Sequence, residues 1–312
     1  MKLSIVTINY NNAEGLRRTL NSVTAQTYHD IEHIIVDGGS TDGSVDIIRE
    51  YENTIKRSVT INQSTIQVKW VSEPDMGIYN AMNKGIEIAL GRRVVNTNHT
   101  SNITHHTSQE SLCDYIQILN SGDILASPDV TERMMNALHS FIRSTLNDKI
   151  DVPILYGNMI KKDYITGKIL GKSREVEYSL RQYFSSTMNH DCCYFRRDLF
   201  ETYGLYDESL KIVSDWKWFL QAIGLGKVKP VYVDIDVTIF DASGISETNL
   251  ALRNQERRQV LEELLPPAIL ADYDKYAFPM EQYNRLKKYH LWPIAYFMER
   301  VLFKLNKWKI LK

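Results

Sequence analysis

Short β-rich runs alternate with amphipathic helical patterns through the first half of this chain, and this alternation limits the folds that it can adopt. The β-rich runs are residues 3–8, 31–36, 68–72 and 115–119. Helical patterns follow them, as in the spacing of Ile78, Met82, Ile86 and Leu90, where Gly91 ends the helix. Repeated βαβ units of this size predict a parallel, doubly wound sheet with helices on its faces.

The pattern changes after residue 151. Further strands are expected at residues 154–159, 192–195 and 231–239. A hairpin is expected over residues 160–170, around Thr166-Gly167, and a helix over residues 214–223. From residue 247 onward the sequence predicts helices, with interruptions expected at Pro266-Pro267, Pro279 and Pro293.

Polar residues directly follow four of the predicted strands. They are Asn9 after the first strand, Asp37 after the second, residues 73–75 after the third and residues 120–123 after the fourth. In a doubly wound sheet, ligands bind beyond the carboxyl ends of the strands, where these loops meet. The four clusters therefore predict one binding site at a single edge of the sheet.

The segment VDGGSTDGS, residues 36–44, places an acid at a strand end and then three glycines. Glycine lets the backbone approach a planar base or a ribose closely, and the Asp37 carboxylate can accept a hydrogen bond from either. A tight strand-to-helix turn with Asp42 as the helix cap explains the same residues equally well. The spacing departs from a GxGxxG fingerprint, which weakens an oxidoreductase interpretation.

Charge is distributed unevenly along a chain whose net charge is −1. Residues 285–312 contain eight Lys or Arg residues and one acid, Glu299, which leaves 29 basic and 37 acidic residues in residues 1–284, a net charge of −8. The near-neutral total argues against a nucleic-acid-binding protein. A basic tail on an acidic body suggests that the tail meets something anionic.

That tail, residues 291–312, has the pattern of an amphipathic helix. The apolar residues on one side are Ile294, Phe297, Val301, Leu305 and Trp308, and the basic residues on another are Arg300, Lys304 and Lys307. Such a helix suits an anionic membrane surface. The alternative is a terminal helix that packs on the rest of the protein.

The cysteines and the N-terminal residues bear on the compartment. Cys192 and Cys193 are adjacent and Cys113 stands alone, which disfavours a disulfide framework and favours a reducing compartment. A strand-like run begins at Leu3 with no apolar signal segment before it, and no uninterrupted run of about 18 apolar residues occurs. We therefore expect a cytoplasmic protein that either stays in solution or lies peripherally on the inner face of the cell membrane.

Several segments, in a fixed order, resemble family 2 glycosyltransferases of the GT-A fold. They are SIVTINYNN (4–12), VDGGSTDGS (36–44), SEPDMGIYNAMNKGI (72–86) and DYIQILNSGD (114–123), followed by ILYGNM (154–159), residues 190–220 and SGIS (243–246). The subgroup that the chain most resembles adds sugars to bacterial cell-surface polysaccharides. The resemblance implies an α/β fold, with a mixed, mostly parallel, Rossmann-like sheet flanked by helices and a C-terminal helical extension.

The resemblance also implies the domain organisation. A catalytic domain would occupy residues 1–246, and a helical extension with the basic tail would occupy residues 247–312. Relatives commonly run from the glycine that matches Gly91 directly into a segment like DYI (114–116), so residues 92–113 are expected to form an inserted loop. A tolerated surface insertion is one interpretation of this loop, and a lid or an acceptor contact is the other.

Residue by residue, the resemblance implies a nucleoside pocket lined by Thr7, Asn9 and Asp37. Asp75 and Lys84 would support the donor from the third loop and helix.

The NSGD segment (120–123) matches the family's DxD-type motif, in which Asp123 would hold Mg²⁺ or Mn²⁺ on the donor diphosphate. The leaving diphosphate gains negative charge as the glycosidic bond breaks, and a cation bound by oxygen ligands offsets that charge. This chain has Asn120 and Ser121 where many relatives have another acid, and these two residues are expected to contact the donor. The donor itself would then have to complete the metal site.

The segment SDWKWFL (214–220) matches the position of the family's catalytic carboxylate, which makes Asp215 the expected base. Inverting transfer needs a base within hydrogen-bonding reach of the acceptor hydroxyl. Stabilisation of the helix N-terminus is the alternative role for Asp215. His190 and Asp191 match an HQ segment of relatives, so Asp191 is a departure. We expect His190, Asp191 and Trp216 near the acceptor or the diphosphate, with a structural role as the alternative for His190.

These residues predict an inverting transfer of a hexose or a similar sugar from a nucleotide diphosphate donor, with uridine as the base that the resemblance implies. The acceptor would be a hydroxyl of a saccharide or of a lipid-linked molecule in bacterial surface polysaccharide synthesis. One alternative is a nucleotide-sugar-binding protein with little or no catalysis, because the metal motif lacks its second acid. The other is a nucleotidyltransferase on a similar sheet.

Overall fold

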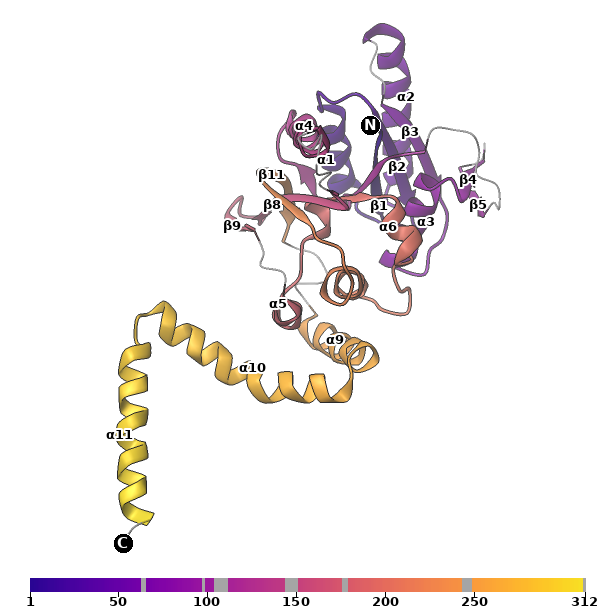
Figure 1. The fold of residues 1–312 in the computed structure, drawn as a ribbon. Helices are drawn as coiled ribbons and strands as arrows, with labels where there is room; N and C mark the ends of the chain where they lie inside the picture. The colour runs from indigo at the N-terminus through magenta and orange to yellow at the C-terminus, as the bar shows by residue number, and fades with distance from the viewer. Residues whose placement is uncertain are drawn as a thin grey trace. The chain divides into compact units, whose positions relative to one another are not determined.

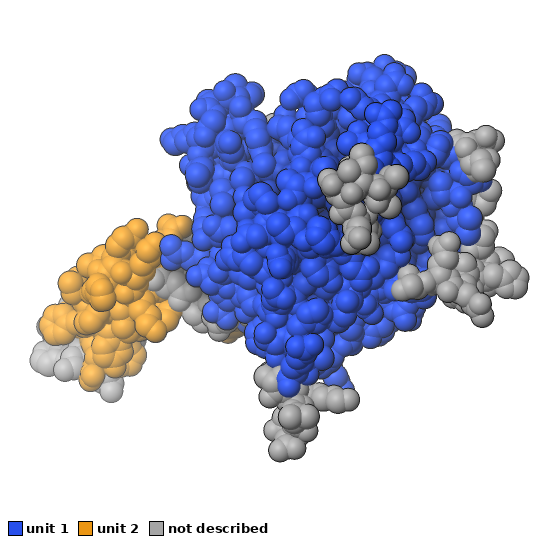
Figure 2. Space-filling model, turned by 90° about the horizontal axis from the view of Figure 1, so that it is seen from above, with its two compact units in different colours: residues 1–256 blue, residues 257–312 orange. Residues whose placement is uncertain are grey.

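The computed structural model describes residues 1–62, 66–96, 99–103, 112–143, 151–175, 179–242 and 249–310. The chain divides into two compact units, Met1–Glu256 and Arg257–Lys312, which are blue and orange in Figure 2. The division falls within helix α9 (Leu250–Leu264), whereas the extension was expected to begin at residue 247. The SGIS segment lies outside the described residues.

A mixed sheet forms the centre of the first unit (Figure 1). Its strands are β1 (Leu3–Asn9), β2 (Ile31–Asp37), β3 (Gln67–Ser72), β6 (Tyr115–Ile118), β7 (Ile124–Leu125), β8 (Ile154–Lys162), β9 (Ile169–Lys172), β10 (Cys193–Arg196) and β11 (Val231–Asp241). Their order is β3-β2-β1-β6-β10-β8-β11-β7, and β9 pairs with β8. β1, β2, β3 and β6 are parallel to one another, while β10 is antiparallel to both of its neighbours. The predicted mixed, mostly parallel α/β fold is confirmed.

Helices cover both faces of this sheet. They are α1 (Ala13–Thr24), α2 (Ser44–Asn62), α3 (Ile78–Ala89), α4 (Val130–Arg143), α5 (Leu180–Ser185), α6 (Asp198–Thr202) and α7 (Ser214–Phe219). On one face, Leu3 and Ile5 of β1 join a core with Leu16 of α1. On the other face, α3 lies so close to β1 that a Cβ added to Gly85 would lie 2.3 Å from Val6 Cγ1. Every residue of β1 is therefore buried, as expected for a strand covered on both faces.

For the second half of the chain, one secondary-structure prediction is confirmed and another is wrong. The hairpin around Thr166-Gly167 is confirmed, since β8 and β9 pair antiparallel and Gly167 has a φ of 71°. The interruption expected at Pro279 is wrong, because helix α10 (Pro267–Lys288) continues through it. A proline inside a helix removes one backbone hydrogen bond and bends the helix, but the turns on both sides can hold it together. The last helix, α11, comprises Trp292–Ile310.

Candidate functional site

A cleft of about 630 Å³ lies at the carboxyl end of β1, where the polar clusters predict a site. The predicted residues among its described lining are Asn9, Asp75, Asn120, Ser121, Asp123, His190 and Asp215. Lining residues that the sequence interpretation missed include Tyr10, Asn12, Tyr79, Lys211 and Asp241. Three of the four polar clusters thus meet in one cleft.

The fourth cluster, Asp37, lies directly behind Asn9 and is fully buried. Its Oδ1 accepts hydrogen bonds from Asn9 Nδ2 (2.8 Å) and Ser40 Oγ (2.6 Å). Its Oδ2 accepts from the Ser40 backbone N–H (2.9 Å) and from Ser72 Oγ (2.8 Å). A carboxylate offers about four acceptor positions, so Asp37 is saturated in this arrangement. It ties together the ends of β1, β2 and β3, and Asn9 is the member of the pair that lines the cleft.

Thr7, expected in the nucleoside pocket, is fully buried and is not among the residues that line the cleft. Its Oγ1 lies 3.0 Å from His33 Nε2, and His33 Nδ1 lies 2.7 Å from the Tyr51 hydroxyl. Burial lowers the pKa of His33 to about 3, which keeps the imidazole neutral. Thr7 therefore links β1 to β2 beneath the site.

Lys84 and Asp75 organise the loop after β3. Lys84 Nζ pairs with Glu73 Oε1 at 3.0 Å and donates to the Pro74 carbonyl at 3.0 Å. These contacts fasten α3 to the loop that carries Asp75 into the cleft. Gly38 allows the approach, because a Cβ there would lie 2.4 Å from Asp75 Oδ2. Lys84 thus supports a cleft residue from behind and does not itself line the cleft.

Trp216 and Asp191 are also buried supports outside the cleft lining. Trp216 Nε1 donates a hydrogen bond to the Tyr183 carbonyl at 2.7 Å.

The Asp191 carboxylate accepts from Thr238 Oγ1 of β11, and the Asp191 carbonyl accepts from Gln117 Nε2 of β6 at 2.8 Å. These bonds hold the short 3₁₀ turn η1 (His190–Cys192), which carries His190, between two strands of the sheet.

The NSGD loop is fixed by contacts from α1 and β11. Gly122 has a φ of 110°, a conformation that favours glycine. Thr19 Oγ1 accepts from the Gly122 N–H at 3.0 Å and donates to the Asp123 carbonyl at 2.7 Å. Asp123 Oδ1 accepts from the Asp241 N–H at 2.9 Å. Burial and the negative charge of Asp191 raise the pKa of Asp123. A bound cation would offset both effects, so this carboxylate fits a metal ligand.

Asp241 brings a second carboxylate into the cleft from the end of β11. Its Oδ2 accepts from Arg18 Nη2 at 3.1 Å, and the Arg18 guanidinium lies 4.4 Å from the centre of the Tyr164 ring. Within the described residues, no group of three or more His, Cys, Asp or Glu residues is arranged to hold a metal ion. Asp123 and Asp241 alone would leave most positions around Mg²⁺ or Mn²⁺ to water and phosphate oxygens.

Asp215, in the first turn of α7, is held by two neighbours. Its Oδ1 accepts from the Tyr79 hydroxyl at 2.8 Å, and its Oδ2 lies 3.2 Å from His190 Nδ1. His190 Nε2 in turn lies 3.3 Å from Asn120 Nδ2. Burial opposes ionisation of both Asp215 and His190, but their mutual hydrogen bond and charges outweigh it. The pKa of Asp215 is therefore lowered and that of His190 raised. His190 thus connects the expected base to the NSGD loop.

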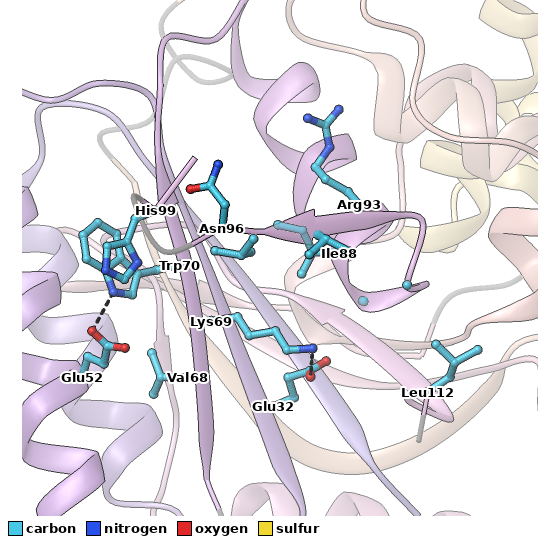
Figure 3. A pocket seen from close by; sticks show the side chains of 14 residues that line it. Glu32, Glu52, Val68, Lys69, Trp70, Ile88, Arg93, Asn96, His99 and Leu112 are labelled. Atoms are coloured by element: carbon cyan, nitrogen blue, oxygen red, sulfur yellow. Dashed lines mark hydrogen bonds and ion pairs between the residues drawn. The ribbon is translucent and has the colours of Figure 1, made fainter. Parts of the chain in front are cut away.

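A second cavity, of about 330 Å³, lies beside the edge strand β3 (Figure 3). The described part of the insertion forms a hairpin here, from β4 (Arg93–Val95) and β5 (Ser101–Ile103), and His99 of its turn stacks on Trp70 at 3.7 Å. The polar groups of this cavity bond to one another. Lys69 Nζ lies 2.9 Å from Glu32, and Trp70 Nε1 donates to Glu52 at 3.0 Å. These contacts indicate a structural role for the β4–β5 hairpin, which covers the edge strand β3.

The family model and the relatives that this sequence matches are all glycosyltransferases. Residues 4–204 match the model of "Glycosyl transferase family 2". An uncharacterised glycosyltransferase of Mycobacterium tuberculosis is 29% identical over 250 residues, which are 78% of this chain and 76% of the relative. The PGL/p-HBAD biosynthesis glycosyltransferase of Mycobacterium bovis is 24% identical over 78% of this chain and 79% of its own length. S. aureus TarS 1-349, solved with UDP-GlcNAc, superposes with a TM-score of 0.56 at 15% identity, over 86% of this chain and 69% of TarS.

Proposed function

The chain belongs to glycosyl transferase family 2, and we propose that it transfers a sugar, with inversion, from a nucleotide diphosphate donor to a hydroxyl of a saccharide or lipid-linked acceptor. The observation that carries this proposal is that two carboxylates line one cleft: Asp123 belongs to the NSGD loop, and Asp215 is linked to Asn120 of that loop through His190. Asp123 suits the donor diphosphate with its cation, and Asp215 suits the acceptor hydroxyl.

Asp215 has the properties of a base that removes the acceptor proton. Its lowered pKa keeps it ionised at neutral pH. Its side-chain partners Tyr79 and His190 fill only part of the roughly four acceptor positions of a carboxylate, which leaves a lone pair for the acceptor O–H. Tyr79 and His190 fix the orientation of the carboxylate. The raised pKa of His190 supports this pair, because a protonated imidazole stabilises the ionised form of Asp215.

The charge of the cleft supports a cation-assisted donor. Asp75, Asp123, Asp215 and Asp241 are acids among the described lining residues, whereas Lys211 is the one lysine or arginine among them. A diphosphate brought into this cleft alone would meet net repulsion. Asp123 and Asp241 are the residues that would hold Mg²⁺ or Mn²⁺. When bound, the cation would offset the negative charge that develops on the leaving diphosphate.

The donor is proposed to be a hexose linked to UDP. Support comes from the fold match to TarS, whose structures are described in complex with UDP-GlcNAc and with UDP. A lipid-linked or saccharide acceptor from bacterial surface polysaccharide synthesis agrees with the M. bovis relative named for PGL/p-HBAD biosynthesis. A cytoplasmic location is part of this proposal. Family membership argues against the nucleotidyltransferase alternative.

The test separates a transferase from a protein that only binds nucleotide sugars. A panel of nucleotide sugars is screened for thermal stabilisation with and without Mg²⁺ or Mn²⁺, since a ligand that binds the native state raises the unfolding midpoint. The best donor is then used in transfer assays with the Asp215→Asn variant. We expect roughly a 10²–10⁴-fold loss of transfer, with stabilisation by the donor unchanged.

Asp46→Asn is the matched control, because Asp46 is an acid with an 82% exposed side chain on α2. Near-normal transfer by Asp215→Asn would require another base. Donor stabilisation in the wild type without any transfer would support the binding-protein alternative.

A further inference from the structure

Helix α11, in the second unit, presents an apolar stripe to solvent. Ile294, Phe297, Met298 and Val301 follow the i, i+3, i+4, i+7 spacing that places residues on one side of a helix. Their exposed fractions are 61%, 66%, 54% and 37%, and the next residue in the series, Leu302, is 56% exposed. Water solvates such a contiguous surface unfavourably, and stripes of this kind mark interaction sites.

Basic and aromatic residues flank the stripe. Arg300 lies next to it on the helix surface, with its guanidinium 5.9 Å from the centre of the Tyr296 ring. Trp292 and Tyr296 are both exposed at the start of the helix. The sequence adds four lysines after Arg300, so that residues 285–312 contain eight basic residues and one acid. Trp, Tyr and basic side chains are the residues that favour the boundary between lipid chains and headgroups.

We propose that α11 is a membrane-surface helix that lies in the headgroup region of an anionic bilayer. Its apolar stripe would enter the boundary of the acyl chains, while Arg300 and the lysines would meet lipid phosphates. Among the described helices, none combines the length and the apolar character that spanning a bilayer requires. The proposal is independent of the donor and of the transfer reaction.

Contacts between α10 and α11 are described at the first turn of α11, which leaves its apolar stripe accessible to solvent. Tyr283 of α10 packs edge-on against Trp292, with ring centres 4.5 Å apart. His290, in the turn between the two helices, has a φ of 56°, a left-handed conformation that ends α10 and changes the direction of the chain. The first turn of α11 thus packs against α10, while the stripe between residues 294 and 302 remains exposed.

The test is flotation of the full-length protein with lipid vesicles. One set contains phosphatidylcholine with roughly one third phosphatidylglycerol, and the other contains phosphatidylcholine alone. We expect recovery with the anionic vesicles, and weaker recovery when NaCl rises from about 0.1 M to about 1 M, which shortens the Debye length from about 10 Å to about 3 Å. The double variant Phe297→Ser/Arg300→Glu should bind at least about tenfold more weakly.

A matched control makes the same two chemical changes elsewhere. Ile165 is 93% exposed in the β8–β9 turn, and Lys168 is exposed beside it. The variant Ile165→Ser/Lys168→Glu should float like the wild type. Equal recovery of the wild type and the α11 variant would overturn the proposal, as would equal recovery with neutral and anionic vesicles. Sedimentation without vesicles tests for a second copy, and a dimer that the α11 variant abolishes would assign the stripe to self-association and also overturn the proposal.

Discussion

The buried histidine beneath the site makes the stability of the sheet depend on pH. His33 is completely inaccessible to solvent and lies between the hydroxyls of Thr7 and Tyr51. Burial lowers its pKa to about 3, and among the described residues no carboxylate bonds to the imidazole to favour the charged form. In the unfolded chain the same imidazole returns to an ordinary pKa of about 6.5.

The magnitude follows from these two pKa values. Between about pH 3 and about pH 6.5 the unfolded state binds a proton that the native state does not bind. The free energy of unfolding therefore falls as the pH falls, by about 1.4 kcal/mol for each pH unit well below 6.5. From pH 7 to pH 5 the contribution of His33 is a loss of about 2 kcal/mol. Against a total stability of roughly 5–15 kcal/mol, this loss is readily measured.

The assay is urea unfolding, followed by tryptophan fluorescence at several pH values between 5 and 7 for the wild type and His33→Gln. The variant loses stability at every pH, because glutamine cannot reproduce both hydrogen bonds. Its pH dependence should nevertheless be weaker than that of the wild type by about 2 kcal/mol over the range. His29→Gln, which removes an exposed histidine just before the same strand, controls for loss of an imidazole, and the difference in slope between the two variants isolates the contribution of the buried one. Parallel curves for the wild type and His33→Gln would refute the reasoning.

Three further perturbations test the site and its support. Tyr79→Phe removes the hydroxyl that donates to Asp215, so the pKa of Asp215 should rise and the acid limb of the kcat/KM profile should move to higher pH. Gly85→Ala forces a methyl group to within 2.3 Å of Val6 and should lower the free energy of unfolding in urea by about 1–3 kcal/mol. Glu32→Gln should cost about 1–3 kcal/mol at pH 7. Burial opposes ionisation of Glu32, but its two lysine partners lower its pKa, so this cost should shrink as the pH falls below about 4.5.

Sequence periodicity was sufficient to predict the sheet and the edge where the site lies. Strands such as β1 and β2 are short, apolar and bounded by polar turns, and each is buried along its whole length. Because parallel strands end at one edge, residues as distant as Asn9 and Asp123 were expected together, and both line the same cleft. The hydrophobic periodicity of the sequence could not predict that β10 is antiparallel to its neighbours, since the direction of a strand depends on how it pairs across the sheet.

Side-chain roles within the site were harder to predict, because they depend on partners distant in sequence. Thr7 was expected to face the nucleoside, but its hydroxyl bonds to His33 inside the core. Asp37 was expected to bind the nucleoside, but its carboxylate oxygens accept hydrogen bonds from Asn9, Ser40 and Ser72. A strand-end residue can point toward the cleft or toward a neighbouring strand, and the sequence does not distinguish these orientations.

The fold brings a second carboxylate to the NSGD motif from a distant part of the sequence. NSGD contains one carboxylate, and the neighbouring acids Asp114 and Asp129 are not among the residues that line the cleft. Asp241, 118 residues later, meets Asp123 because β11 ends at the same cleft and its backbone N–H bonds to the Asp123 carboxylate. An acid that directly follows a predicted strand was the available signal, since the strand expected at residues 231–239 ends just before it. With Asp75 and Asp215, four acids are among the described residues that line the cleft. A diphosphate should therefore bind there together with a divalent cation far better than without one.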